Sequence, residues 1–379
     1  MLGEGVTGQS VRKALAHLGL REVSCSEADL IVTSPGIPST AFPQVSTPII
    51  SEIEFAFRLF SDTGPRLIAV SGTNGKSTTT AMLSFLLDCP YAGNIGIPLI
   101  DFIETEVSCL VIELSSYQLE ACTTFAPHVA VMLNLSPDHL ARHGSFSNYK
   151  QAKANLFSRQ DQSDVLFYNQ DDSEVVDLVR FAPSICVPVS KTDSVAMALS
   201  SQFSGHDLLN ATMAAHVAMG EGLSMETILT KMTCFQPLEH RMEYLPAIHG
   251  VTYINDSKAT NHAATISAIQ SLDKPVHLLL AGEDKIEISD AQWLRFLDQL
   301  PSHIASVSVS GGLHDRLKRL SANLNITLHV FRYLREAVFY VKRQARSGEI
   351  VLFSPSSTSF DEFDSFEQRG RQFKKWARL

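Results

Sequence analysis

The run Gly72-Thr73-Asn74-Gly75-Lys76-Ser77 has the residue types of a phosphate-binding loop. A glycine-rich turn lets backbone N–H groups face an anion, and the start of the following helix adds its positive dipole end. In this pattern Lys76 reaches the β- and γ-phosphates, and the Ser77 hydroxyl binds Mg²⁺. Val70 stands where the usual, longer loop has its first glycine. The alternative is a tight turn before a helix that binds no anion.

Of the polar side chains further along the chain, Glu113 alone has a position that predicts a role beside this loop. Glu113 follows the apolar run Cys109–Ile112, and a carboxylate at the end of a neighbouring strand is a typical ligand of nucleotide-bound Mg²⁺. Taken alone, Glu113 could equally be a solvated strand end. His139 and His143 are four residues apart, but this spacing is common by chance and predicts no zinc site. Lys153, taken alone, would be a solvent-exposed helix lysine.

The last third of the chain carries four polar loops, each after a short apolar run. The runs are predicted strands: Val251–Asn255, Val276–Ala281, Ala305–Val309, Ile326–Phe331 and Ile350–Phe353. The loops are Asp256–Asn261, Gly282–Lys285, Gly311-Gly312 and Ser354–Ser359. Helical patterns such as Ala263–Leu272 alternate with the strands, which predicts a parallel sheet with all four loops at one edge. Their lysines, Asp and hydroxyls suit an anionic substrate beside ATP, although each loop alone is ordinary turn chemistry.

The elements that must position the phosphate loop are predicted in the same way. Leu67–Val70 is a buried strand before the loop, Thr78–Leu87 is an apolar helix after it, and Val129–Leu133 is a further strand. The first 60 or so residues are less regular, with a helix at about Ser10–Leu18 and a strand at Leu30–Thr33.

Gly3–Gly8 has the glycines of a turn between a strand and a helix, but only Met1 and Leu2 precede it. Such a turn needs a strand before it. We therefore expect either that translation begins upstream of Met1 or that the N-terminal domain has a reduced sheet.

Composition excludes several classes of protein. The 379 residues are 45% apolar, which excludes a disordered chain or a collagen. The net charge of −9 argues against nucleic acid as a partner. Six cysteines without a C-x-x-C pair argue against a disulfide framework or zinc ribbon and fit the cytoplasm. We expect no signal peptide and no membrane association, because no apolar run approaches about 18 residues.

These motifs together resemble the Mur ligases of peptidoglycan synthesis. The matching runs are Gly72–Ser77, Gly93–Gly96, Glu113–Ser116, Asp138-His139, Glu239–Arg241 and Asn255–Asn261. Asn255–Asn261, Ser354-Pro355, Ser359–Asp361 and Phe366–Gly370 are similar to the branch that adds D-glutamate to UDP-N-acetylmuramoyl-L-alanine. The resemblance implies an α/β fold of three domains: a reduced Rossmann-like N-terminal domain (1–62), a central P-loop-type ATPase domain (63–237) and a C-terminal Rossmann-like domain (238–379). It further implies a cytoplasmic monomer that uses ATP and Mg²⁺, with small-molecule substrates only.

The resemblance also implies roles for individual residues. For ATP they are Gly72, Thr73, Asn74, Gly75, Lys76, Ser77, Thr78, Asn210, Arg241 and Asp256. For Mg²⁺ they are Ser77, Glu113, His139 and Lys153, the last as a carbamate. For the two other substrates they are Thr7, Ser34, Gly36, Asn94, Thr260, Lys285, Ser359 and Phe366. Lys76, His139, Lys153 and Lys258 are the implied catalytic residues.

One motif departs from the family pattern. The family has H-N-x-x-N on the adenine side, whereas this chain reads His206-Asp207-Leu208-Leu209-Asn210. Asp207 cannot donate through an amide. Two alternatives stay open: another amide ligase of the Mur or folylpolyglutamate type, or an inactive nucleotide-binding relative.

Overall fold

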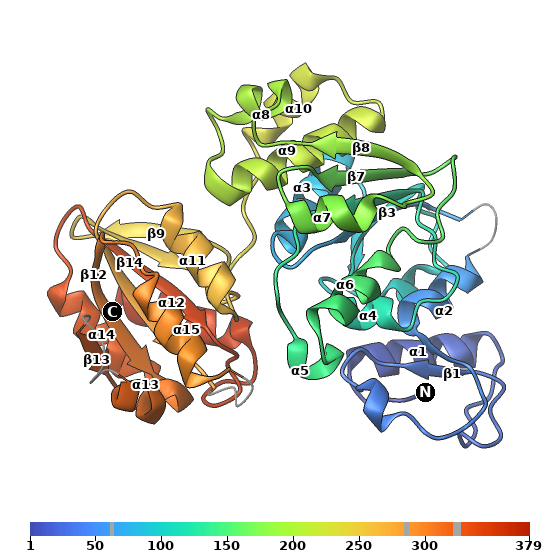
Figure 1. Ribbon diagram of the computed structural model, residues 1–379, viewed down its shortest axis with the longest axis horizontal. Coiled ribbons are helices and arrows are strands. Elements are labelled where there is room, and N and C mark those ends of the chain that lie inside the picture. Colours follow the sequence, from blue (N-terminus) through green and yellow to red (C-terminus); the bar gives the residue numbers. More distant parts are fainter. Residues whose placement is uncertain (61–63, 284–287, 321–326) are drawn as a thin grey trace. The chain divides into compact units, whose positions relative to one another are not determined.

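The chain forms an α/β fold in two compact units, Met1–Phe235 and Gln236–Leu379. The structure is a computed structural model that describes residues 1–60, 64–283, 288–320 and 327–379 (Figure 1). The domain limits 1–62, 63–237 and 238–379 stay predictions.

The first unit is built around a six-stranded sheet in the order β4-β5-β3-β6-β7-β8. Every neighbouring pair in it is parallel. The strands are β3 (Arg66–Ser71), β4 (Tyr91–Gly93), β5 (Cys109–Glu113), β6 (Val129–Met132), β7 (Val165–Asn169) and β8 (Ile185–Val189). Because all run the same way, the residues that follow β3, β4, β5 and β6 meet at one edge.

Helices cover both faces of this sheet, as a parallel sheet requires (Figure 1). They are α2 (Glu52–Leu59), α3 (Lys76–Leu87), α4 (Ser116–Glu120), α5 (Leu140–His143), α6 (Phe146–Ala154), α7 (Ser173–Val179), α8 (Ser194–Leu199), α9 (Gly205–Gly220) and α10 (Met225–Met232), with the 3₁₀ turn η2 (Leu99–Phe102). Adjacent residues of β3 enter different cores: Ala69 packs with Tyr149 and Leu156, and Val70 with Met82 and Ala214. The central strands therefore read as unbroken apolar runs.

The N-terminal region pairs β1 (Ile31–Thr33) with β2 (Ile49–Ser51) in parallel, beside α1 (Val6–His17) and the 3₁₀ turn η1 (Ser39–Ala41). Leu2 extends this small sheet, since its N–H donates to Val32 O at 2.8 Å and its carbonyl accepts from Ser34 N at 2.9 Å. Leu2 thus pairs with β1 directly before the glycine turn.

The second unit holds a six-stranded sheet in the order β13-β12-β11-β14-β10-β9. Its strands are β9 (Glu243–Ile248), β10 (Val251–Asn255), β11 (Val276–Ala281), β12 (Ile304–Ser310), β13 (Leu328–Val330) and β14 (Ile350–Ser356). Its helices are α11 (His262–Gln270), α12 (Asp290–Asp298), α13 (His314–Leu320), α14 (Leu334–Gln344) and α15 (Phe366–Arg378), with the 3₁₀ turn η3 (Gly311–Leu313).

The five predicted strands of this unit, β10 to β14, pair in parallel as expected, and β9, which the sequence did not predict, adds an antiparallel edge strand beside β10. The other pairs are parallel, so the ends of β10, β11, β12 and β14 share one edge. Ile326, in a predicted strand, lies outside the described residues.

Candidate active site

The phosphate loop joins β3 to α3, as the sequence predicts, and it can only be built with glycine at position 75. Gly75 caps α3 with φ at +83°, in the left-handed region. A Cβ added there would lie 2.3 Å from Asn210 Oδ1. Asn210, on α9, also accepts from the Thr79 hydroxyl at 3.4 Å. Asn210 therefore lies directly against the loop, although the two are 135 positions apart in the chain.

Two lysines from different elements meet at the carbonyl of Gly72. Lys76 Nζ donates to it at 2.9 Å and also to Thr73 O at 2.8 Å. Lys153 Nζ, from α6, donates to the same carbonyl at 2.8 Å and to Ser71 Oγ at 3.2 Å. Lys153 is only 1% exposed, so the alternative of a solvated helix lysine is wrong. Burial lowers the pKa of Lys153 well below its ordinary value, and the positive charge of Lys76 lowers it further.

Residues that follow the neighbouring strand β6 hold the loop in place, and the sequence analysis did not single them out. The amide of Asn134 exchanges two hydrogen bonds with the backbone of Asn74, at 2.8 and 3.0 Å. The Thr73 hydroxyl contacts Tyr149 Oη at 3.0 Å and accepts from Ser136 N at 3.0 Å. A usable signal was present, since Asn134 directly follows a predicted strand next to the loop.

Glu113 and Asn94 are brought together at the ends of β5 and β4. Asn94 Nδ2 donates to Glu113 Oε1 at 2.7 Å, and Asn94 N donates to Glu113 O at 2.9 Å. Glu113 and Ser77 are both buried. A hydroxyl and a carboxylate are hard oxygen ligands of the kind Mg²⁺ takes, with phosphate and water completing its shell. The donor set and the glycine cradle thus suit a nucleotide phosphate with Mg²⁺.

His139 begins α5 from the left-handed region, with φ at +54°. It is half exposed, its ring lies 4.8 Å from that of Tyr117, and its Nε2 is 3.7 Å from Asp138 Oδ2. His143 instead turns inward to Ser116 Oγ at 3.0 Å, so the two histidines do not form a metal pair. Across the described ranges, no group of three or more His, Cys, Asp or Glu side chains could hold a metal ion.

Asp207 and Asn210 of the departing motif lie one turn apart on α9. Asn210 Nδ2 donates to Asp207 Oδ1 at 3.3 Å. The Asp207 carboxylate thus accepts from the side-chain amide of Asn210. The oxygen of the same amide lies against Gly75.

Residues expected to bind the UDP part gather around the glycine turn of the N-terminal region. A Cβ at Gly3 would lie 2.6 Å from Ser34 Cβ, so the turn packs on the end of β1. Thr7 lies in the first turn of α1, and Gly36 is exposed two residues beyond Ser34.

In the second unit, Asp256 follows β10 and is buried. Its Oδ2 accepts from Ser354 Oγ at 2.8 Å, and its Oδ1 accepts from Met242 N at 3.3 Å. These bonds join the ends of β10 and β14 to the segment that carries Arg241.

Lys258 and Phe366 also come together, with Lys258 Nζ 5.1 Å from the centre of the Phe366 ring. Phe366 begins α15, and its carbonyl accepts from Ser257 Oγ at 2.8 Å. Ser359 is buried beyond β14, and Thr260 lies in the loop after β10. Lys285 lies outside the described residues.

Arg369, on α15, is the organiser of this edge that sequence reasoning missed. It is fully buried, and its guanidinium donates to neutral oxygens of three loops. The acceptors are Ser257 Oγ and O, Ala281 O, Ser357 O and Thr358 O, at 2.8 to 3.3 Å. Burial lowers the pKa of Arg369 to about 10. The side chain still carries its charge at neutral pH.

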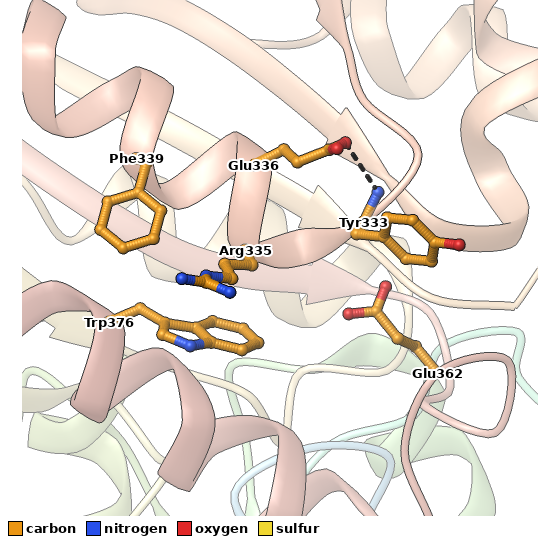
Figure 2. A pocket seen from close by; sticks show the side chains of 6 residues that line it. All are labelled: Tyr333, Arg335, Glu336, Phe339, Glu362 and Trp376. Atoms are coloured by element: carbon orange, nitrogen blue, oxygen red, sulfur yellow. Dashed lines mark hydrogen bonds between the residues drawn. The ribbon is translucent and has the colours of Figure 1, made fainter.

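A pocket in the second unit is lined by residues that the sequence did not predict as site residues. It has a volume of about 520 Å³ and is lined by Tyr333, Arg335, Glu336, Phe339, Glu362 and Trp376 (Figure 2). Glu336 and Glu362 accept from the backbone at the start of α14, at Tyr333 N and Leu334 N. Both carboxylates thus serve to cap a helix.

No helix within the described ranges has the length and apolar character to cross a membrane.

Comparison with known proteins identifies the family. Residues 70–203 match the Mur ligase middle domain, and residues 240–357 match the Mur ligase glutamate ligase domain. The chain is 34% identical to the UDP-N-acetylmuramoylalanine--D-glutamate ligase of Clostridioides difficile (strain 630), over 94% of this chain and 86% of that protein. It is 32% identical to the ligase of the same name from Koribacter versatilis, over 100% of this chain and 88% of that one.

Solved structures share the fold. The MurF ligase of Thermotoga maritima in complex with ADP superposes with a TM-score of 0.65 at 16% identity, over 93% of this chain and 89% of that one. A murein peptide ligase from Psychrobacter arcticus gives 0.56 at 14% identity, over 99% and 97%. With the paired lysines at the phosphate loop and the family matches over both units, the chain belongs to the Mur ligase family.

Proposed function

We propose that this chain is an ATP-dependent ligase that joins D-glutamate to UDP-N-acetylmuramoyl-L-alanine, as a monomer in the cytoplasm, during synthesis of the peptidoglycan precursor. The observation that carries the proposal is the meeting of Lys76 and Lys153 at Gly72, on a phosphate loop between a parallel strand and a helix. Relatives named for this ligation cover most of the chain at about a third identity.

The chemistry is activation of a carboxylate followed by amide formation. The L-alanyl carboxylate attacks the γ-phosphate of ATP to give an acyl phosphate and ADP. The amine of D-glutamate then attacks the acyl carbon, and the tetrahedral intermediate loses phosphate. Both steps bring anions together, so the protein must supply cations and hold the reactants in line.

Residues of the first unit fit the activation step. The loop from Gly72 to Thr78 would cradle the phosphates, with Lys76 offsetting their charge as it builds up on transfer. Asn94, held by Glu113, would contact the substrate near its reacting carboxylate. Ser77 and Glu113 would hold one Mg²⁺, and His139 and the Lys153 carbamate a second. When bound, Mg²⁺ would neutralise phosphate oxygens.

Lys153 fits the carbamate role because a carbamate forms from a neutral amine and CO₂. An ordinary lysine is almost wholly charged at neutral pH. Burial and the charge of Lys76 both favour the neutral form of Lys153. Carbamoylation would replace this amine by an anionic oxygen donor.

Residues of the second unit fit the second half of the reaction. Arg241 and Asp256 are the residues of this unit proposed to bind the nucleotide, and Asn210 is a proposed nucleotide residue of the first unit. Lys258 would act at the reacting centre, and its place over Phe366 joins it to the proposed D-glutamate residues. Those are Thr260, Lys285, Ser359 and Phe366.

At the other end of the substrate, Thr7, Ser34 and Gly36 would contact the UDP part.

A phosphate-release assay with an amino-acid panel tests the proposal. The chain is incubated with ATP, Mg²⁺ and UDP-N-acetylmuramoyl-L-alanine, together with D-glutamate, L-glutamate, D-aspartate or L-lysine in turn. Release is expected only with D-glutamate and only when all components are present. Preference for another amino acid would identify a different amide ligase, and ATP binding without turnover would identify an inactive relative.

A further inference from the structure

Two cysteines lie near the amino ends of neighbouring strands, away from the proposed active site: Cys109 begins β5, and Cys89 lies between α3 and β4. β4 and β5 pair in parallel, with Tyr91 opposite Val111. Cys89 lies two residues before Tyr91, and Cys109 lies two residues before Val111. The segment that carries Cys89 is joined to β5 by a hydrogen bond from Val111 N to Pro90 O at 3.1 Å. The two thiols lie within hydrogen-bonding reach of each other, and both cysteines pack against the same core.

Their surroundings leave both thiols accessible. Cys89 and Cys109 pack, with Tyr91, against the core that includes Leu86 and Val111. Both are only partly buried, and neither is in a disulfide. Two thiols in contact at the surface of a sheet edge can be reached by a small reagent without unfolding.

We propose that Cys89 and Cys109 are a modification site that forms a reversible intramolecular disulfide by exchange with a small-molecule disulfide such as oxidised glutathione. The inference is independent of the proposed ligase activity. The cysteines flank the first paired position of two strands, and the spacing of paired strands, about 4.8 Å, is inside the range of Cα separations that a disulfide spans.

The exchange balances in two steps. The Cys109 thiolate attacks one sulfur of the small disulfide, whose S–S bond breaks and releases one thiolate. The Cys89 sulfur, having lost its proton, then attacks Cys109 and displaces the second small thiolate. The two protein protons end on the two released thiols, so the protein loses two electrons and the small disulfide gains them.

The surrounding groups decide which sulfur attacks first. The hydrogen bond from the Cys89 thiol lowers the pKa of Cys109, and the same bond raises the pKa of Cys89. The thiolate is the nucleophile in exchange, so Cys109 attacks and Cys89 resolves.

The link would act on the strand pair that carries two proposed site residues. β4 is a three-residue edge strand, and Asn94 and Glu113 lie just at the far ends of β4 and β5. A disulfide at the other end would fix β4 to β5 and limit fraying of this edge.

Peptide mapping under non-reducing conditions tests the proposal on the whole protein. After treatment with oxidised glutathione and alkylation of the remaining thiols, we expect a peptide pair linked through Cys89 and Cys109, which dithiothreitol separates. Cys186 and Cys234 are exposed and serve as internal controls that acquire glutathione without linking to each other. If those two carry glutathione while Cys89 and Cys109 are found unlinked, whether alkylated or glutathionylated, the proposal is overturned.

An early quench of the unmodified chain tests the order of attack. Glutathione should be found on Cys109 before it is found on Cys89, because the bond between the thiols lowers the pKa of Cys109 and raises that of Cys89. Equal labelling of both positions at early times would overturn the assigned roles. Cys89→Ser should accumulate a stable glutathione adduct on Cys109, because no resolving thiol remains. Since the link and its order are sought in the unmodified chain, the result does not depend on the folding of the variant.

Discussion

Lys76 and Lys153 donate to one carbonyl oxygen, that of Gly72, at 2.9 and 2.8 Å. Two ammonium groups this close repel each other, and only Lys153 is fully buried. Because burial also disfavours its charged form, Lys153 is the lysine that loses its proton at the lower cost in free energy. The contact thus gives the two lysines different charge states.

Lys153→Ala should leave the protein folded but nearly inactive in phosphate release. If the carbamate oxygen is the missing group, short carboxylates such as acetate or formate should restore part of the activity. Lys150→Ala on the same helix is the control, because Lys150 contacts Glu174 and the Phe146 ring rather than the phosphate loop. Full activity of Lys153→Ala would contradict the assigned role.

Lys76→Ala should lower the rate of phosphate release by at least about a hundredfold. A cation that stabilises charge at the transition state is typically worth several kcal/mol. The midpoint of thermal unfolding should change little, because the carbonyls that accept from Lys76, those of Gly72 and Thr73, belong to its own loop. A folded variant with near wild-type turnover would rule out phosphate binding by Lys76.

Asn134→Ala should raise the Kd for ATP about tenfold while leaving the Kd for the UDP-substrate unchanged. The change removes both bonds that fix Asn74, and a lost pair of this kind costs about 1–3 kcal/mol. Isothermal titration with each ligand measures the two constants. Asn155→Ala, which removes only a bond to Leu119 O, is the matched control. Equal weakening of both ligands would indicate general loosening instead.

Glu52→Gln should change how stability depends on pH. Burial raises the pKa of Glu52 to about 7, against an ordinary 4.5, despite the bond from Ile100 N. Between these values the folded chain holds a proton that the unfolded chain has released, so the wild type loses stability as pH rises from about 5 to 7. The loss is at most about 3 kcal/mol. Thermal midpoints should therefore favour the variant increasingly from pH 5 to pH 8, and a constant difference would refute this.

Glu54→Gln, two residues further along α2, should change the pH dependence of stability in the opposite direction. Burial alone would raise the pKa of Glu54, but hydrogen bonds from Thr124, Arg58 and Thr123 outweigh it and lower the pKa to about 2. The carboxylate therefore stabilises the fold above pH 4.5, and that contribution falls as pH drops towards 2. The variant should be destabilised at pH 7, with a penalty that shrinks in acid.

Ser34→Ala should weaken binding of the UDP-substrate more than Thr7→Ala does. The N–H of Ser34 is held by Leu2 O directly after β1, whereas Thr7 lies in the first turn of α1 without a preceding full strand. Ligand titration compares the two, with Ser10→Ala on α1 as the control. The reverse order would contradict the prediction.

Much of the sheet structure could be predicted because central parallel strands are buried on both faces. β10 and β11 match their predicted runs residue for residue, and β3 and β5 match within one or two positions. The edge strands were missed for the converse reason. β9 and β8 each contain a proline and alternate poorly between buried and exposed residues, and β4 is only three residues long.

Burial of charged side chains could not be predicted from local pattern. Lys153 lies in a polar helix and was expected, on its own residues, to face solvent, yet the fold places it against Gly72. Arg369 lies in a helix with many charges, and nothing near it in sequence points to its acceptors. Such contacts arise from the meeting of distant segments, which only the resemblance to a family could anticipate.

The bonds of Arg369 set an order of events during protein synthesis. Its guanidinium donates a hydrogen bond to Ser257, which lies 112 positions earlier in the chain. At a ribosomal rate of about 5–20 residues per second, the loop after β10 waits roughly 6–22 s before its buried partner exists. During that interval the β10 and β11 loops lack the charge that gathers them. Nascent chains stalled before α15 should therefore present this edge to proteases and chaperones, although β10 and β11 have already been made.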